Sequence, residues 1–381
     1  MKGAKPRVCF VVATEITVTA FLLDQIRTAA KTHDVCVALN TRNNAFLAPY
    51  EINVEVVPVA IERKIKPLAD LAALFALYRL FRARRFDLVH SVSPKAGLLA
   101  MLAGFLAGVP RRLHVFTGQV WVTRRGLSRF FLKSLDRLLA ALATHLLADS
   151  PSQRDFLVAE GVVTATKCTV LGKGSISGVN TARFQPDAAA RDMVRLELAV
   201  PADGVLFLYL GRLNRDKGIA DLAAAFANLC CSRDDVWLAL VGPDEESMAA
   251  LVWRFCGAHA DHLRLVDYTN TPQRYMAAAD VFCLPSYREG FGTVVIEAAA
   301  CGVAAIASRI YGLTDAVIDA ETGLLHAAGD VPAIESMMAR LAGDRALRQR
   351  LGTAARNRAC ADFAMPVLTS ALLAFYAKML D

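Results

Sequence analysis

Short runs of apolar residues alternate along the chain with longer segments in which apolar residues recur at helical spacing. The runs predict buried strands at residues 8–13, 34–39, 54–59, 87–91, 112–116 and 145–149. The longer segments predict helices at residues 21–31, 67–85, 95–108 and 127–142. Because short apolar strands separated by helices are typical of parallel sheets covered on both faces, we expect an α/β fold.

This alternation is interrupted once and then restarts. Residues 172–187 contain three glycines and a proline with little periodicity, which predicts a linker. A second series of strands is predicted at residues 205–211, 236–241, 263–266, 280–285 and 304–307, with a helix at 222–229. We therefore expect two doubly wound Rossmann-like domains, residues 1–185 and 186–364, facing each other across a cleft. The amphipathic segment 365–381 predicts a helix that packs back on the first domain.

Composition favours a globular protein with large cores. The chain has 381 residues, of which 55% are hydrophobic. The uncharged apolar run at residues 96–110 is shorter than the roughly 20 residues that span a bilayer, so it predicts a buried helix. Glu15 soon follows the first apolar run, which favours a strand over a secretion signal. The nine cysteines are scattered without a C-x-x-C pair, as is typical of reduced thiols in a cytoplasmic protein.

Charge is distributed unevenly. Residues 1–185 hold 25 Lys/Arg and 12 Asp/Glu, a net +13, whereas the remainder holds 18 and 24, a net −6. A basic half predicts an anionic partner. In residues 79–85 and 124–137, cations are interspersed with large apolar side chains, which is typical of a helix on an anionic membrane or of a packed helix with a solvated basic face. Nucleic acid is disfavoured because no helix-turn-helix or aromatic stacking motif accompanies the charge.

The most informative stretch runs from residue 286 to residue 297. Glu289 precedes the turn Gly290-Phe291-Gly292, after which Thr293 begins an apolar, helix-like run that contains Glu297. This pattern places one carboxylate on a loop, backbone N–H groups at a helix N-terminus, and a second carboxylate within the helix. Such an arrangement can hold a sugar nucleotide, with one acid at the sugar, the N–H groups at the diphosphate and the other acid at the ribose.

A second motif, Gly211-Arg-Leu-Asn-Arg-Asp-Lys217-Gly218, follows the most apolar strand. Arg212 and Lys217 then lie beyond the carboxyl end of a strand, where doubly wound sheets bind ligands. Two cations beside a turn suit a diphosphate, and solvated turn residues are the alternative. The glutamates of the first motif favour the phosphate interpretation.

Residues at other strand ends are candidates for acceptor or cleft contacts, with ordinary loop residues as the alternative. These candidates are Thr14, Glu15, Lys95, Thr117, Gln119 and Lys173. Lys173 belongs to a glycine-rich loop spaced G-x-G-x-x-x-G, a weak dinucleotide fingerprint that we interpret as a hinge. His114 lies inside a predicted strand, which is typical of a core histidine.

Together these motifs resemble the retaining GT-B glycosyltransferases of family four. The pattern E-G-F-G-x-x-x-x-E spans Glu289 to Glu297, G-R-L-x-x-x-K-G spans Gly211 to Gly218, and a third similar segment spans residues 311–325. The resemblance implies that Arg212 and Lys217 hold the donor diphosphate and that Glu289 contacts the donor sugar. It also implies that Glu297 binds the ribose and that the N–H groups of Gly292 and Thr293 face the β-phosphate.

The first half departs from the common pattern of that family. Many members have a glycine pair after the first strand, where this chain has Ala-Thr-Glu-Ile-Thr at residues 13–17. Thr117 stands where many members have a histidine, so Thr117 or Gln119 would contribute near the reacting carbon. The variant is similar to bacterial enzymes that extend lipid-linked sugars, which agrees with the basic first domain.

The resemblance implies a metal-independent transferase, without a cofactor, that moves a hexose or N-acetylhexosamine from a UDP- or GDP-sugar. The implied acceptor is a polyprenyl-diphosphate-linked saccharide in surface glycan assembly, met by a peripheral protein at the inner face of the cell membrane. Alternatives are a UDP-sugar epimerase of the same architecture and a non-catalytic membrane-binding module. A nicotinamide-dependent oxidoreductase is disfavoured because no G-x-G-x-x-G follows a strand.

Overall fold

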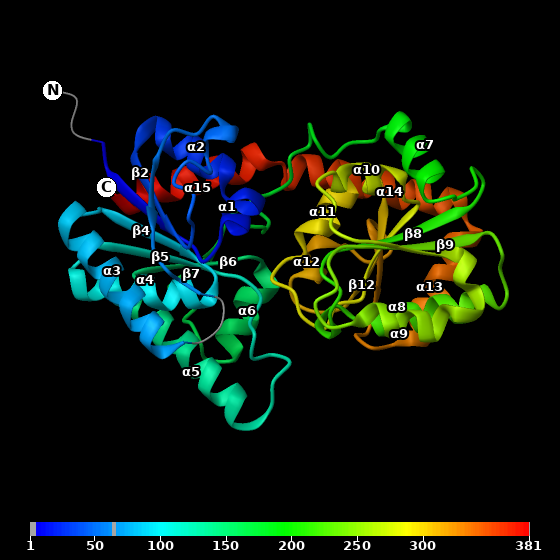
Figure 1. Cartoon of the computed structure of the whole chain (residues 1–381), viewed down its shortest axis with the longest axis horizontal. Helices are drawn as coiled ribbons and strands as arrows, with labels where there is room; N and C mark the ends of the chain where they lie inside the picture. Colours follow the sequence, from blue (N-terminus) through cyan, green and yellow to red (C-terminus); the bar gives the residue numbers. More distant parts are fainter. Residues whose placement is uncertain (1–4, 63–65, 381) are drawn as a thin grey trace. The chain divides into compact units, whose positions relative to one another are not determined.

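The computed structural model describes residues 5–62 and 66–380, which form two compact units (Figure 1). The first unit comprises the described residues up to Ser177 together with helix α15 (Met365–Leu380), and the second comprises Gly178–Ala364. The second unit begins before the predicted boundary at residue 185. Residues 178–185 belong to it because Val179 pairs with Ala364 and Phe184 is buried in its core.

The described part of the first unit contains a seven-stranded parallel sheet. Its spatial order is β3-β2-β1-β4-β5-β6-β7. The strands are β1 (Arg7–Val11), β2 (Asp34–Leu39), β3 (Glu55–Pro58), β4 (Leu88–Val92), β5 (Arg111–Phe116), β6 (His145–Ala148) and β7 (Cys168–Val170). All five residues of β4 are buried, as expected for a strand with helices on both faces.

Two groups of helices cover this sheet. On one face lie α3 (Pro67–Arg84), α4 (Pro94–Ala107), α5 (Gly126–Leu142) and α6 (Pro151–Ala159), and on the other lie α1 (Glu15–Phe21), α2 (Leu23–Thr32) and α15 (Figure 1). Helix α15 packs on α2, and Thr369 Oγ1 donates a hydrogen bond of 3.0 Å to the Asp24 carboxylate. The C-terminal helix therefore completes the first unit.

One helix that the pattern did not indicate lies directly before a predicted helix. The helix expected at residues 21–31 is preceded by α1, and the two are separated at Leu22. Thr14 is the N-cap of α1 because its side chain accepts a hydrogen bond from the Thr17 N–H. Glu15 consequently lies in the first turn of a helix and not in an irregular loop.

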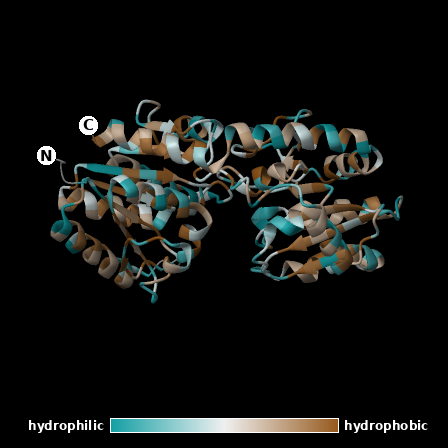
Figure 2. Ribbon diagram, turned by 90° about the horizontal axis from the view of Figure 1, so that it is seen from above, coloured by the Kyte–Doolittle hydropathy of each residue, from teal (hydrophilic) through white to brown (hydrophobic). Residues whose placement is uncertain are grey.

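The second unit repeats the architecture with a six-stranded parallel sheet in its described residues, ordered β10-β9-β8-β11-β12-β13. The strands are β8 (Val205–Leu210), β9 (Val236–Val241), β10 (Leu263–Val266), β11 (Val281–Leu284), β12 (Ala304–Ser308) and β13 (Gly323–His326). In Figure 2 these strands carry mostly the hydrophobic colour. They form the centre of the larger hydrophobic core.

Helices also lie on both faces of the second sheet (Figure 1). One group comprises α7 (Ala188–Glu197), α10 (Pro272–Ala278), α11 (Thr293–Ala300) and α14 (Arg345–Asp362), and the other comprises α8 (Ile219–Cys230), α9 (Met248–Cys256) and α13 (Val331–Gly343). The short helix α12 (Leu313–Ala316) joins β12 to β13. Two Rossmann-like units with parallel sheets confirm the predicted fold class.

In both sheets the strand order reverses beside the first strand of the unit. Strand β1 pairs with β2 and β4, and β8 pairs with β9 and β11. Ligands of doubly wound sheets bind at the carboxyl ends of the two strands that flank such a reversal. In the second unit these are the ends of β8 and β11, which carry the two strongest sequence motifs.

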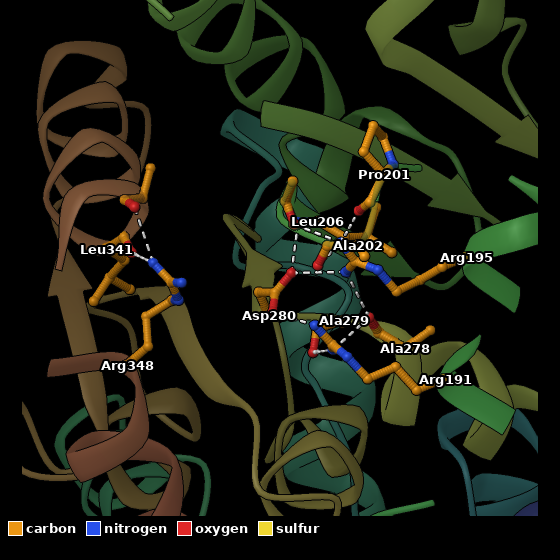
Figure 3. A network of polar contacts seen from close by, with 12 residues as sticks. Arg191, Arg195, Pro201, Ala202, Leu206, Ala278, Ala279, Asp280, Leu341 and Arg348 are labelled. Atoms are coloured by element: carbon orange, nitrogen blue, oxygen red, sulfur yellow. Dashed lines mark hydrogen bonds and ion pairs between the residues drawn. The ribbon is translucent and has the colours of Figure 1, made fainter. Parts of the chain in front are cut away.

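A buried polar network ties α7 to the second sheet (Figure 3). The Asp280 carboxylate accepts hydrogen bonds from Arg191 at 2.7 Å, from Arg195 at 3.0 Å and from the Leu206 N–H at 2.8 Å. Arg195 also donates to the Pro201 carbonyl at 2.5 Å, and its side chain is only 5% exposed. Because the buried Arg195 guanidinium is poorly hydrated, the Asp280 carboxylate is needed to compensate its positive charge.

We expect Asp280→Asn to lower the free energy of unfolding of the second unit by about 3–5 kcal/mol, because a buried guanidinium loses its counter-charge. Urea unfolding is followed by tryptophan fluorescence in a Trp121→Phe background, which leaves Trp237 and Trp253 as reporters of the second unit. The matched control is Asp235→Asn, whose ion pair with Arg233 at 2.6 Å is partly exposed and contributes under about 1 kcal/mol. Equal losses in the two variants would contradict this account.

Candidate functional site

The loop that follows β8 holds its cations in defined positions. The Tyr209 hydroxyl donates a 2.8 Å hydrogen bond to the Arg212 carbonyl, which fixes the start of the loop. The loop then forms a 3-10 turn, Arg215–Lys217, and ends at Gly218, from which α8 starts. Lys217 is thereby placed at the N-terminal end of α8, beyond the carboxyl end of β8.

The loop that follows β11 brings a carboxylate to this lysine. Lys217 Nζ forms an ion pair with Glu289 Oε1, and the buried Ser286 hydroxyl donates to the same oxygen at 2.8 Å. The side chains of Lys217 and Glu289 are only 19% and 13% exposed, so solvent screens the pair weakly. Two residues that the sequence singled out from separate motifs are therefore in direct contact.

A close backbone approach makes this contact possible. Gly218 has a φ of +68°, and a Cβ at this position would collide with the Pro285 carbonyl oxygen. Only glycine satisfies both the left-handed backbone and the contact. The Tyr287 N–H also donates to the Asp216 carbonyl at 2.8 Å, which links the two loops through their backbones.

Arg212 has a different partner, which the sequence reasoning missed. Its Nη1 donates to Glu245 Oε2 at 2.8 Å, and the two side chains are 44% and 35% exposed. Glu245 belongs to the loop after β9, and its N–H donates to the Leu213 carbonyl at 3.1 Å. The sequence does indicate where Glu245 lies, because residues 244–246 follow a predicted strand and therefore belong to the same edge of the sheet.

The glycine-rich turn after Glu289 leads directly into α11. Phe291 is buried, and its ring lies 5.1 Å from that of Phe363, which anchors the turn. Gly292 is the N-cap of α11 with a φ of +82°, and Thr293 is the first helical residue. The carbonyl of neighbouring Gly290 passes so close to Gly312 that a Cβ on Gly312 would collide with it. The first N–H groups of α11 have no carbonyl partner within the helix and can bind an anion.

Glu297 lies in α11, and its side chain is half-buried. Burial raises the pKa of its carboxyl to about 7, an effect that the charge of Arg183 opposes. A carboxyl with such a pKa changes charge near neutral pH, and a ligand that hydrogen-bonds to the ionised form would lower this pKa again. Burial and titration near neutrality are both typical of a functional carboxyl.

In the first unit the candidates after β1 and β4 are engaged in local contacts. The Glu15 carboxylate accepts a hydrogen bond from the Thr41 hydroxyl, and the Thr14 hydroxyl caps α1. Lys95 Nζ lies 2.5 Å from Asp70 Oδ1, and both side chains are about one-fifth exposed. These side chains stand at the strand reversal of the first sheet, where they contact residues of their own unit.

Gln119 differs most from its expected place, because its side chain is buried. Its Nε2 donates to the Thr117 carbonyl at 2.6 Å, and Gln153 Nε2 donates to that carbonyl at 2.7 Å. The amide therefore supports the loop after β5 from within. Thr117 is partly exposed at this strand end, and Lys173 is exposed.

His114 is a core histidine, as its position within the strand predicted. Its Nδ1 lies 2.9 Å from the Ser91 hydroxyl, and burial lowers its pKa to about 3. A neutral, buried imidazole of this kind is a weak base at physiological pH.

Comparison with known protein families agrees with both units. Residues 191–358 match the family described as glycosyl transferases group 1, and residues 18–174 match a glycosyl transferase 4-like domain. These matched families lend no support to the epimerase alternative.

Curated relatives extend over most of the chain. The capsular polysaccharide biosynthesis glycosyltransferase CapM of Staphylococcus aureus is 29% identical over 320 residues, which cover 84% of this chain and 83% of CapM. The UDP-Gal:alpha-D-GlcNAc-diphosphoundecaprenol alpha-1,3-galactosyltransferase of Escherichia coli is 28% identical over 294 residues, which cover 75% of this chain and 74% of that enzyme.

Solved structures show the same fold. HepE of Anabaena, crystallised in complex with UDP, has a TM-score of 0.80 at 18% identity and covers 98% of this chain and 100% of its own. A glycosyltransferase from Rickettsia africae has a TM-score of 0.80 at 17% identity and covers 100% of this chain and 99% of its own. With two matched family models, relatives along most of its length and this fold, the chain belongs to the GT-B glycosyltransferases of family four.

Proposed function

We propose that this glycosyltransferase moves a hexose or N-acetylhexosamine from a UDP-sugar to a polyprenyl-diphosphate-linked saccharide in bacterial surface glycan assembly. We further propose that it retains the anomeric configuration, requires no metal ion, and works at the cytoplasmic face of the membrane. The observation that carries the proposal is the contact between Lys217 and Glu289 at the strand reversal of the second sheet, where Arg212 lies on the same loop as Lys217.

The geometry of the second unit supports a site for a nucleoside diphosphate. Lys217 and Arg212 supply positive charge beyond the end of β8, and the first N–H groups of α11 supply hydrogen-bond donors beyond the end of β11. Arg212 would exchange Glu245 for a phosphate, since an exposed ion pair of this kind is weak. UDP is favoured over GDP because the Escherichia coli relative is named for a UDP-sugar.

Glu289 is suited to bind hydroxyl groups of the donor sugar. The hydrogen bonds that Lys217 and Ser286 donate to its carboxylate both use Oε1. Oε2 of a carboxylate fixed in this way can accept from a sugar hydroxyl. The ion pair keeps the Glu289 carboxylate oriented beside the cation that faces the diphosphate.

The chemical contribution of Lys217 and Arg212 is electrostatic. When the bond between the anomeric carbon and the diphosphate oxygen breaks, negative charge develops on the departing nucleoside diphosphate. Cations already held in place stabilise that charge without reorganising at the moment of reaction. Lys217 is the better held of the two because it is the less exposed.

The lipid-linked acceptor is supported by the named activity of a relative and by the charge of the first half of the chain. The Escherichia coli relative is named for an acceptor linked to diphosphoundecaprenol. Residues 1–185 of this chain carry the net +13 noted above, which suits an anionic, diphosphate-bearing lipid.

Lys217→Ala should reduce kcat for transfer from the UDP-sugar about 100- to 1000-fold, because one preorganised donor to the leaving group is lost. Transfer to a synthetic polyprenyl-diphosphate saccharide is measured by chromatography after calorimetry has identified the UDP-sugar that binds. The matched control is Arg233→Ala, which removes a cation of the second unit at the amino end of β9, the opposite edge of the sheet. Full activity of Lys217→Ala would overturn the assignment of the site.

The same assay separates transfer from epimerisation. A transferase forms no new sugar product when the acceptor is left out, whereas an epimerase converts the UDP-sugar alone. Sugar conversion without an acceptor would contradict the proposal even if Lys217 were essential.

Glu297→Gln should raise the thermal stability of the donor-free protein at pH 8. The folded-state pKa of about 7 exceeds the usual value of 4.5, so the wild type loses stability as pH rises from about 4.5 to about 7. Removing the charge recovers about 1–3 kcal/mol above pH 7 and nothing below pH 4.5. Melting curves of both proteins across this range check the sign.

Donor binding tests whether Glu297 also contacts the ribose. Hydrogen bonds from ribose hydroxyls favour the ionised carboxyl, so wild-type affinity for a UDP-sugar should increase between pH 6 and pH 8. Affinity of the Glu297→Gln variant should be at least about tenfold weaker at pH 8 and change little with pH. A variant that is stabilised but binds the UDP-sugar normally would assign Glu297 a structural role only.

A further inference from the structure

The helical layer formed by α3, α4 and α5 leaves an unusual number of large apolar side chains exposed. Helix α4 lies between α3 and α5, and the three cover one face of the first sheet (Figure 1). Of the 21 exposed large apolar side chains in the described residues, nine belong to these helices: three to α3, two to α4 and four to α5. We refer to the outward side of this layer as the α3–α5 surface. Concentration of this kind marks an interaction site, whereas scattered exposed apolar residues do not.

The exposed residues of α5 share one face of the helix. Leu127, Phe130, Phe131 and Leu138 are separated by three, one and seven positions, which places them within one side of a 3.6-residue helix. Phe130 is 66% exposed and Phe131 57% exposed. The buried positions of the same helix, including Leu139, lie on the opposite side. Helix α5 therefore presents an apolar face away from the sheet.

Helix α3 shows the same arrangement. Leu68, Leu71 and Phe75 are exposed and follow one another at spacings of three and four. Arg79, whose guanidinium lies 5.8 Å from the centre of the Phe75 ring, continues this stripe. At the end of α4, Phe105 and Leu106 are also exposed. The apolar residues of the three helices thus belong to one layer.

The charges on these helices are almost entirely positive. Their acidic residues are Asp70, which pairs with Lys95, and Asp136, which is buried against the Trp121 indole N–H at 2.8 Å. Exposed arginines of this surface include Arg82 on α3, Arg137 on α5, and Arg124 and Arg125 directly before α5. A surface with exposed Phe and Leu, many arginines and no exposed carboxylate on its helices matches the interface of an anionic bilayer.

We infer that the α3–α5 surface binds the surface of an anionic lipid bilayer, with Phe130 and Phe131 inserted between the headgroups. No helix of the described residues is both long and apolar enough to cross a membrane, and the surface needs none for this interaction. A second copy of the chain fits less well, because a two-fold contact through this surface would place arginines opposite arginines, and the three helices offer no exposed carboxylate to pair with them. This inference rests on the proposed function, because a lipid-linked acceptor requires the enzyme to work at a membrane, and it adds the surface that would bind that membrane.

The full-length protein is sedimented with vesicles of phosphatidylcholine alone or mixed with phosphatidylglycerol, in the absence of donor and acceptor. We expect binding to the mixed vesicles that weakens with salt, and little binding to phosphatidylcholine alone. Phe130→Ser with Phe131→Ser should weaken binding by about tenfold or more, as should Arg124→Gln with Arg125→Gln. The control Leu196→Ser removes a more exposed apolar side chain from α7 of the second unit and should have no effect.

Three further measurements keep the outcomes distinct. Circular dichroism checks that each variant is folded, and a Phe130→Trp variant should show a blue shift of emission when mixed vesicles are added. Transfer to a short, water-soluble acceptor analogue should be unchanged in the phenylalanine variant, so loss of membrane binding and loss of catalysis are separable. Equal binding of wild type and both double variants would overturn the inference. So would a wild-type dimer in sedimentation velocity that the phenylalanine variant cannot form.

Discussion

The approach of Gly218 to the Pro285 carbonyl determines how the loops of the second unit can be arranged. These loops follow two adjacent parallel strands, β8 and β11, between which the strand order of the sheet reverses. A side chain at residue 218 would force the loops apart, because the contact is made by backbone atoms that cannot move independently of the sheet. With the loops in contact, Lys217 meets Glu289, Asp216 meets Tyr287, and α8 and α11 both begin beside the same ends of the strands. The candidate site thus depends on the strand order of the sheet and on the glycine at residue 218.

Much of the fold follows from apolar patterning alone. Strand β8 was predicted because residues 205–210 are apolar throughout, and such a run between helices is buried on both faces. Helix α1 was missed because Ile16, Thr17, Val18 and Thr19 are β-branched and disfavour a helix in isolation. The cap formed by Thr14 and the burial of Val18 against the sheet compensate for this. Strand β13 was missed because its four residues begin with a glycine and end with a histidine, which leaves only two apolar residues in the run.

The candidate site was predictable to the extent that it depends on strand ends. Arg212, Lys217 and Glu289 follow strands directly, and the rule for doubly wound sheets places them at one edge. Which cation meets which carboxylate was not predictable, because it depends on the separation of loops that are far apart in sequence. Glu245 reaches Arg212 from the loop after β9, and no local pattern encodes that distance. Gln119 shows that a position at a strand end does not ensure exposure. Its side chain points inward and donates a hydrogen bond to the Thr117 carbonyl.

The two ion pairs of the candidate site differ in a way that suits different tasks. The pair of Arg212 with Glu245 is well exposed, so breaking it costs under about 1 kcal/mol and a phosphate can replace the carboxylate. The pair of Lys217 with Glu289 is shielded, and the Ser286 hydroxyl strengthens it, so removing either partner would leave a poorly hydrated charge. If the diphosphate binds as proposed, Arg212 changes partner while Lys217 and Glu289 remain in place. A fixed pair preserves the alignment of sugar and phosphate, and a mobile arginine lets the nucleotide enter and leave. The two pairs consist of the same kinds of group, a cation and a glutamate, so their different roles follow from their different burial.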